Sequence, residues 1–328
     1  MHCRNTLWLA RHIRFIPVML IVVALLGGPA DVRADHSNGG QWPGDHRYVV
    51  AFAQDTTRND WRTAQVRELK EALAPYPFIE FKFSDAKGKM ANQILDIENY
   101  VAEGVDILVT SPVDENAMAP VISSAFKKGI PVFLLSRSVN SDDYTAYITG
   151  DNFEIGRQAA SYIAERVQGS GKILMLEGVS TSSTAKARTD GFLAGLEKHK
   201  GLSISFRKNA DYLRGKSILA VQEALDKGIK FDAIYAHSDS MATGARIGLK
   251  KAGIDPSSIV IVGIDYISEA RKAILAGEQS ASFTYPTYGK EGGELIVKLL
   301  KGQIIPKKSI VYSTRITKEN AASVEPIF

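Results

Sequence analysis

The chain has 328 residues, of which 45% are apolar and 23% charged, and its formal net charge is +4. These proportions are ordinary for soluble globular proteins, and they exclude a wholly disordered chain, a collagen and a small disulfide scaffold. As a prior, the length indicates about two domains.

The first 34 residues are typical of a secretory signal peptide. Three arginines precede an uninterrupted apolar run, 15–26, which is shorter than the roughly 20 residues that a spanning helix needs. Small residues then predict cleavage after Ala34. Cleavage after Ala30 and an uncleaved anchor are the alternatives.

Removing this segment takes away four arginines and one aspartate and leaves 36 basic and 35 acidic side chains. A nearly neutral chain offers no electrostatic reason to bind nucleic acid or an anionic membrane. Cys3 is the single cysteine and leaves with the signal, so the mature chain has no disulfide and no cysteine metal site. We therefore expect an exported, periplasmic monomer.

Residues 35–46 are expected to form a flexible lead, and from Tyr48 short β-rich runs alternate with longer amphipathic stretches. The predicted strands are 48–53, 78–83, 107–110, 131–135, 146–149, 172–176, 203–207, 233–235, 259–262, 281–284 and 310–313. The predicted helices are 60–73, 89–102, 114–128, 153–167, 184–198, 215–227, 241–252, 268–276 and 289–300. Such alternation predicts an α/β protein with parallel sheets covered on both faces. Because the rhythm restarts near Gly150, we expect two doubly wound parallel-sheet domains.

Ligands of open α/β sheets bind beyond the carboxyl ends of the strands, so the residues that follow each strand are the candidates for a site. Amides, hydroxyls, carboxylates, guanidinium groups and one tryptophan recur there. An aromatic plane suits the apolar C–H face of a sugar, and planar Arg, Asn and Asp groups bond several hydroxyls at once. This set of residue types is therefore suited to a sugar.

Four segments carry a family resemblance: 59–62 (NDWR), 131–137 (PVFLLSR), 235–242 (YAHSDSMA) and 263–265 (GID). They resemble the ribose-, galactose- and galactofuranose-binding periplasmic proteins, the sugar-binding components of ABC importers. The resemblance spans about 47–318 and is nearest to the galactofuranose type, which shares the Trp-Arg pair.

The resemblance implies the type I periplasmic binding fold, in which two lobes joined by three crossovers enclose a ligand cleft. We expect an N-terminal lobe of 47–148 plus 287–306 and a C-terminal lobe of 149–286 plus 307–328. The expected crossovers lie near 143–152, 285–287 and 306–309.

The positions after the strands, together with the resemblance, give a predicted ligand-binding set. It comprises Gln54, Asn59, Trp61, Arg62, Ser136, Arg137, Arg188, Tyr212, Ser238, Asp239, Asp265 and Tyr285. Several residues have other readings: Trp61 as core, Arg62 as a solvated first-turn residue, and Asn59 and Asp114 as helix caps. His237 is expected to be structural.

Two positions depart from the family pattern. The family usually has Asp before the arginine of the fourth strand, where this chain has Ser136, and often Asn where it has Ser238. The predicted set then holds three positive charges, on Arg62, Arg137 and Arg188, against one acid, Asp265, with Asp239 as a second. An anionic sugar would neutralise the positive surplus. The alternative, which we favour, is a neutral sugar with one arginine paired by Asp55, Asp114 or Glu177.

These features predict a periplasmic solute-binding protein that delivers a monosaccharide or polyol to the permease of an ABC importer, with no catalytic residue, cofactor or metal. A sensory receptor that signals through a chemoreceptor or kinase is the alternative. A sugar-responsive regulator would need an N-terminal helix-turn-helix where the signal stands. An enzyme lacks its motifs, since no dinucleotide, P-loop or nucleophile-elbow signature and no metal-spaced histidines occur.

Overall fold

The computed structural model describes residues 46–328. The signal peptide of 1–34, its cysteine and the lead of 35–46, except for His46, lie outside the described residues. Within 46–328, no helix combines the length and the apolar character needed to cross a membrane.

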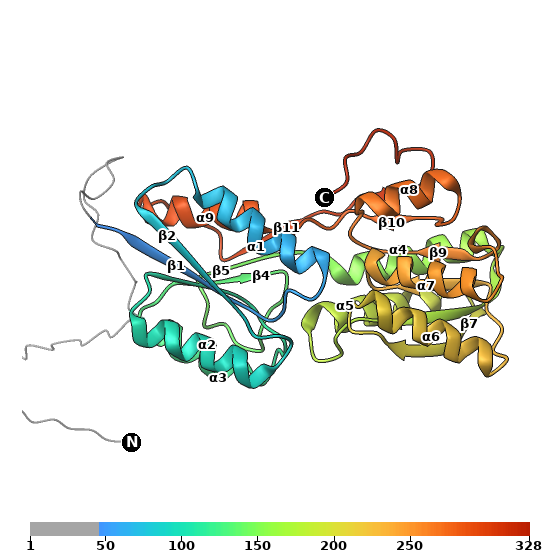
Figure 1. Ribbon diagram of the computed structural model, residues 1–328, viewed down its shortest axis with the longest axis horizontal. Coiled ribbons are helices and arrows are strands. Elements are labelled where there is room, and N and C mark those ends of the chain that lie inside the picture. The colour runs from blue at the N-terminus through green and yellow to red at the C-terminus, as the bar shows by residue number, and fades with distance from the viewer. Residues whose placement is uncertain (1–45) are drawn as a thin grey trace, which may run out of the picture. The chain divides into compact units, whose positions relative to one another are not determined.

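Six parallel strands form the first sheet, in the order β11-β5-β4-β3-β1-β2. They are β1 (Tyr48–Gln54), β2 (Ile79–Asp85), β3 (Ile107–Ser111), β4 (Val132–Leu135), β5 (Ala146–Gly150) and β11 (Lys308–Val311). Figure 1 shows α1 (Asp60–Leu73) and α9 (Gly289–Leu300) on one face, and α2 (Met90–Glu103) and α3 (Ala119–Lys127) on the other. We call these elements the first lobe.

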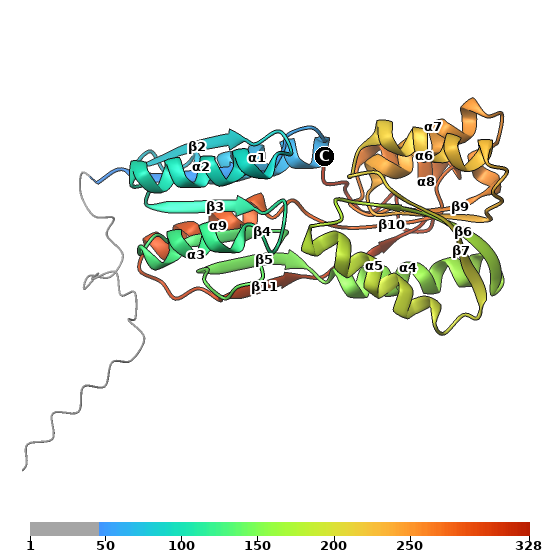
Figure 2. The same ribbon diagram turned by 90° about the horizontal axis from the view of Figure 1, so that it is seen from below.

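The second sheet has four parallel strands in the order β7-β6-β8-β9. They are β6 (Ser170–Glu177), β7 (Gly201–Asn209), β8 (Ala233–Ala236) and β9 (Val260–Val262). In Figure 2, α4 (Asn152–Arg166) and α5 (Ser183–Leu196) lie on one side, and α6 (Arg214–Asp226) and α7 (Asp239–Lys251) on the other. The 3₁₀ turn η1 (Pro256–Ser258), α8 (Ser268–Ala276) and an antiparallel pair, β10 (Ser282–Phe283) with β12 (Arg315–Ile316), complete this second lobe.

Both sheets are buried on two faces because alternate side chains of a strand point to opposite sides. In β1, Val50 and Phe52 join one hydrophobic cluster while Ala51 joins another. In β6, Met175 likewise joins one hydrophobic cluster and Leu174 joins another. The expectation of parallel sheets covered on both faces is thus confirmed.

Close helix packing brings α5 to the edge where the two lobes meet. A Cβ on Gly156 of α4 would collide with the backbone carbonyl of Arg188 in α5, and a Cβ on Gly191 would collide with that of Phe153. Glycine at both positions therefore lets the helix axes approach, which fixes where the Arg188 side chain leaves α5.

Three connections join the lobes: 151 between β5 and α4, 284–288 between β10 and α9, and 312–314 between β11 and β12. The third connection lies after β11 rather than at 306–309, because β11 pairs with β5 in the first sheet. The expectations that 306–309 forms a crossover and that all of 307–328 belongs to the C-terminal lobe are therefore wrong.

Candidate functional site

A cavity lies between the two lobes, beyond the carboxyl ends of their parallel strands. The lining residues enclose about 370 Å³ not filled by protein atoms, part of which is open solvent. They are Asn59, Trp61, Arg62, Ser136, Arg137, Thr184, Arg188, Tyr212, Ser238, Ser240, Asp265 and Tyr285. Both lobes contribute, so a bound molecule would touch both.

Ten of the twelve residues in the predicted set line this cavity. Thr184 and Ser240 also line it and were not predicted. Each lies in the first turn of a helix, α5 or α7, rather than directly after a strand. Reading one helical turn further along the chain would have found both.

Gln54 and Asp239 do not line the cavity, and the prediction is corrected for both. Gln54 is fully buried at the end of β1, where its Nε2 donates to Gln65 Oε1 at 3.0 Å and its Oε1 accepts from the backbone N–H of Asp55. Asp239 is fully buried behind Asp265. Both side chains use their polar atoms within the protein.

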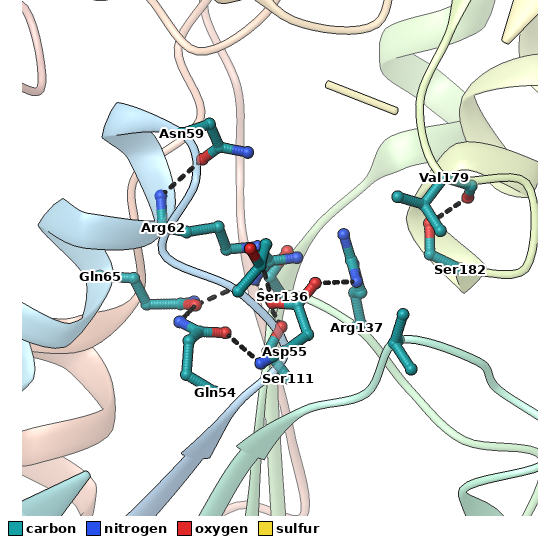
Figure 3. A network of polar contacts seen from close by, with 12 residues as sticks. Gln54, Asp55, Asn59, Arg62, Gln65, Ser111, Ser136, Arg137, Val179 and Ser182 are labelled. Atoms are coloured by element: carbon teal, nitrogen blue, oxygen red, sulfur yellow. Dashed lines mark hydrogen bonds and ion pairs between the residues drawn. The ribbon is translucent and has the colours of Figure 1, made fainter. Parts of the chain in front are cut away.

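Asp55 holds two cavity arginines together (Figure 3). Its Oδ2 accepts from Arg137 Nη1 at 2.8 Å, and its Oδ1 lies 3.3 Å from Arg62 Nε. Arg62 also donates to Ser111 Oγ at 2.6 Å and to Gln65 Oε1 at 2.9 Å. Burial, followed by the charge of Arg137, lowers the pKa of Arg62 to about 10, so the guanidinium stays protonated at neutral pH.

Arg188 is the third cavity arginine, and it comes from the second lobe. Its Nε donates to Asn152 Oδ1 at 3.0 Å and its Nη1 to the carbonyl of His237. His237 Nδ1 faces the N–H of Gly178 at 3.3 Å, and burial, with Arg188 nearby, lowers the pKa of His237 well below its ordinary value. His237 is therefore a neutral structural histidine that fixes the strand end beside Arg188.

Each guanidinium lies against an aromatic ring. The distances from guanidinium carbon to ring centroid are 5.0 Å for Arg62 and Trp61, 5.7 Å for Arg137 and Tyr212, and 4.4 Å for Arg188 and Tyr285. The rings favour the cations and restrict their orientation. The site thus presents three oriented pairs of flat groups.

Trp61 lies both in the core and at the cavity. It belongs to the hydrophobic core cluster and donates from Nε1 to the carbonyl of Tyr285 at 3.1 Å, yet it also lines the cavity. Asn59 likewise caps α1, since its Oδ1 accepts from the N–H of Arg62 at 2.8 Å, and it still lines the cavity. Asp114 accepts from the N–H groups of 116 and 117 and is not a lining residue.

Three lining residues have left-handed backbone: Ser136 (φ 69°), Tyr212 (φ 61°) and Asp265 (φ 119°). Such conformations cost non-glycine residues free energy and persist where the surroundings enforce them, often at functional sites. At Ser136 the N–H donates to Ile148 O at 2.8 Å and the carbonyl accepts from Thr149 Oγ1 at 2.9 Å. The fold therefore holds these side chains in conformations that are costly in isolation.

Several buried polar atoms that belong to lining residues have no partner among the described residues. They are Arg137 Nε, Arg188 Nη2 and the Tyr212 hydroxyl. Burying polar atoms without partners costs free energy, so proteins rarely keep such groups without a reason. A ligand with several hydroxyls would supply the missing acceptors.

Asp265 is the cavity carboxylate of the second lobe. Burial raises its pKa well above the ordinary value, and the charge of Arg188 opposes that rise. Among the described residues, no group of three or more His, Cys, Asp or Glu side chains is arranged to hold a metal ion. The polar chemistry of the site is therefore that of guanidinium, hydroxyl, amide and carboxylate groups.

The lobes also touch each other directly beside the cavity. Thr181 Oγ1 of the second lobe donates to Val113 O at 2.8 Å, and the Glu115 N–H donates to Thr181 O at 3.1 Å. Lys186 and Glu115 form an ion pair across the same line. These contacts join loops after β3 and β6, so the described arrangement is a closed one.

Comparison with known proteins gives the family. A model of the periplasmic binding protein domain matches residues 50–304. The galactofuranose-binding protein YtfQ of Escherichia coli K12 is 28% identical over 84% of this chain and 90% of its own length. The ribose import binding protein RbsB of Salmonella typhimurium is 28% identical over 68% of this chain and 75% of its own.

Solved structures agree with this assignment. The fructose-binding periplasmic domain of a hybrid two-component system has a TM-score of 0.80 and 32% identity, over 84% of this chain and 92% of that one. The type I periplasmic binding fold that the sequence predicted is thus confirmed. The chain belongs to the family of periplasmic binding protein domains.

Proposed function

We propose that this protein is a periplasmic solute-binding protein that captures a monosaccharide or related polyol between its lobes and delivers it to an ABC importer. The relatives named above bind galactofuranose and ribose, and the second is an import protein. The proposed ligand-contacting residues are the twelve that line the cavity.

One observation carries this proposal: three guanidinium–aromatic pairs converge on a single cavity from two lobes. Arg62 and Arg137 come from the first lobe, and Arg188 comes from the second. Flat rings suit the C–H faces of a sugar, and buried guanidinium N–H groups make strong bonds to its hydroxyl oxygens. A compound that lacks a hydroxyl leaves a buried donor unpaired and binds less tightly.

The mechanism is binding followed by closure, without turnover. A ligand that contacts both lobes stabilises the closed form over the open one, because only the closed form makes both sets of contacts. The three connections between the lobes are the proposed hinge. The importer would then recognise the closed, loaded form.

A thermal-shift screen over pentoses, hexoses and polyols tests the proposal, followed by calorimetry on each compound that raises the melting temperature. A ligand that binds only the folded state must raise that temperature. Chromatography of the incubated ligand tests for turnover. No shift with any sugar or polyol, or conversion of the ligand into a product, would contradict the proposal.

Export and partnership are parts of the same proposal. The signal features of 1–34 support a mature periplasmic monomer beginning near Asp35. Mass spectrometry of the exported protein and its elution volume check this. Retention of Met1 would favour an uncleaved anchor.

A sensory role is the second candidate, because the fructose-binding relative is a domain of a signalling protein. Uptake of labelled sugar by cells that lack the gene separates the two. Lost uptake supports the importer, whereas normal uptake with a lost transcriptional response supports the sensor.

The position of Asp55 supports the neutral-ligand alternative, since this one carboxylate lies between Arg62 and Arg137. Arg188 lies near Asp265, whose pKa burial raises well above its ordinary value. An anionic sugar would have to approach Asp265. A competition panel that pairs each neutral sugar with its acid decides the matter, and a preference for the acids that Arg62→Gln weakens would support the anionic alternative.

A further inference from the structure

Asp239 is a buried carboxylate whose two oxygens are fully engaged behind the cavity. Its Oδ2 accepts from the N–H of Tyr266 at 2.7 Å and from Ser282 Oγ at 2.6 Å. Its Oδ1 accepts from Gln279 Nε2 at 2.7 Å. The side chain is fully buried, and none of its partners is a ligand-facing atom.

The partners of Asp239 belong to the segments that form the second-lobe wall of the cavity. Tyr266 directly follows the lining residue Asp265, and Ser282 begins β10, which leads to Tyr285. Asp239 itself stands between two lining serines at the start of α7. One carboxylate therefore ties together three pieces of chain that each present a side chain to the cavity.

The turn at 265–266 has a strained backbone that hydrogen bonds must hold in place. Asp265 has φ 119° and Tyr266 φ 62°, two successive residues in a region that favours glycine. The Asp265 N–H donates to Phe283 O at 2.8 Å, and its carbonyl accepts from the Tyr285 N–H at 3.2 Å. The Tyr266 N–H, on the peptide between the two strained residues, donates to Asp239 Oδ2 at 2.7 Å and lies 3.1 Å from Ser282 Oγ, which itself donates to Asp239. Asp239 therefore constrains this peptide both directly and through Ser282.

The chain makes room for this carboxylate. A Cβ on Gly263 would overlap Asp239 Oδ1, so only glycine permits the approach. On the outer side, Arg246 donates to Gln279 Oε1 and, from Nη2, to Thr243 Oγ1 at 2.9 Å. Gln279 is thereby oriented with its amide N–H groups toward Asp239. A buried charge held this way is costly compared with an apolar core, which favours a role other than stability.

We propose that Asp239 is a positioning residue: it contacts no ligand, and it fixes the 265–266 peptide so that the Asp265 carboxylate points into the cavity. The predicted effect of Asp239 on ligand affinity rests on the proposed function. Its effect on the placement of Asp265 does not, because that placement is a property of the ligand-free protein.

The first test needs no ligand. In Asp239→Ala, amide hydrogen exchange at Tyr266 should accelerate, and a crystal structure should show the 265–266 peptide rotated and the Asp265 carboxylate displaced. In Asp239→Asn, the remaining carbonyl oxygen still accepts from Tyr266, so the conservative variant should restore the turn. An unchanged Asp265 in Asp239→Ala would overturn the proposal.

The second test measures affinity by calorimetry, with the strongest binder among D-ribose, D-fructose, D-galactose and xylitol. Asp239→Ala should weaken binding about 5- to 100-fold, the cost of losing a buried acceptor. In an Asp265→Ala background it should weaken binding no further, because its effect passes through Asp265. In an Arg62→Ala background the two losses should multiply.

Two further variants keep the test independent of folding. Val221→Ala removes core volume from the same lobe, away from the cavity, and should lower the melting temperature without changing affinity. Gly263→Ala leaves every donor in place but displaces the carboxylate, and should reproduce the loss seen in Asp239→Ala. Equal losses in the presence and absence of Asp265 would contradict the positioning role. Failure of the wild-type protein to bind any of the four compounds would count against the proposed ligand class instead, and the first test would still decide this one.

Discussion

Asp55 accepts a hydrogen bond from Arg137 at 2.8 Å, although one residue follows β1 and the other follows β4. The family usually carries an acid beside this arginine, where the chain has Ser136. Asp55 supplies a negative charge from the end of β1, which β3 separates from β4 in the sheet, and it reaches Arg62 at the same time. The charge balance of the cavity is thus set by a residue outside the lining set.

We expect Asp55→Asn to destabilise the fold by roughly 3–5 kcal/mol, because removing one partner of a buried ion pair leaves the other charges uncompensated. Urea denaturation of the ligand-free protein measures the free energy of unfolding. Asp114→Asn is the control, since its carboxylate only caps a turn. A loss no larger than that of the control would show that Asp55 is dispensable.

Arg137→Ala and Asp265→Ala should cost the most affinity among the cavity variants. Both side chains are buried, and truncating one partner of a buried, hydrogen-bonding set costs roughly 2–5 kcal/mol, or about 30- to 4000-fold in affinity. Ser240→Ala, which removes a neutral hydroxyl from the same cavity, should cost less. Calorimetry on variants shown to be folded would refute this ranking if either charged variant bound as well as the wild type.

How far the sequence predicted the fold is clear from two elements. The run 310–313 is predicted to be a strand, and a strand is present at Lys308–Val311. No residue within the run indicates that β5 is its partner. The predicted helix at 114 begins only at Ala119, and the residues before it form a turn whose N–H groups at 116 and 117 donate to the Asp114 carboxylate. Local patterns predict an element, whereas long-range pairing and side-chain competition decide its sheet and its start.

The candidate site shows the same division. Ser136, Arg137 and Asp265 directly follow strands, so sheet topology brings them together as predicted. Asp239 was placed with them because it also follows a strand, but the first turn of α7 rotates its side chain toward Tyr266. Which of two adjacent polar residues faces the cavity depends on backbone rotation, which a sequence pattern does not contain.

Trp61 should report ligand binding by a shift in its fluorescence, because it lines the cavity and its ring lies beside Arg62. Trp42 is the other tryptophan of the expected mature chain, so Trp42→Phe isolates the signal. Titration of this variant with a ligand that calorimetry has established provides the measurement. An unchanged spectrum at saturation would leave Trp61 with its core role alone.

Gly178→Ala should weaken binding while the second lobe stays folded. A Cβ at Gly178 would fall within the ring of Tyr212, so the ring must move, and the Arg137 guanidinium that lies against it loses its support. We expect a loss of affinity similar to that of Tyr212→Ala, and no further loss when the two changes are combined. Calorimetry on the two single variants and the double variant tests this, and independent losses would contradict it.

The stability of the protein should depend on pH through Asp239. Burial raises the pKa of Asp239 to about 6 in the folded protein, against an ordinary value of 3.8. Between these values the folded state binds the proton more tightly than the unfolded chain, so this group's contribution to stability is complete below pH 4 and is lost as the pH rises through 6.

Wild type should therefore lose roughly 2–3 kcal/mol of unfolding free energy relative to Asp239→Asn between pH 4 and pH 7, since one pKa unit corresponds to about 1.4 kcal/mol. Urea denaturation across this range measures the shift, and taking the difference removes the contributions of other groups. Val221→Ala, which changes no titratable group, should differ from the wild type by the same amount at every pH. A constant difference for Asp239→Asn as well would mean that the ordinary carboxylate pKa is kept in the fold, and that the three hydrogen bonds to Asp239 offset the cost of burying its charge.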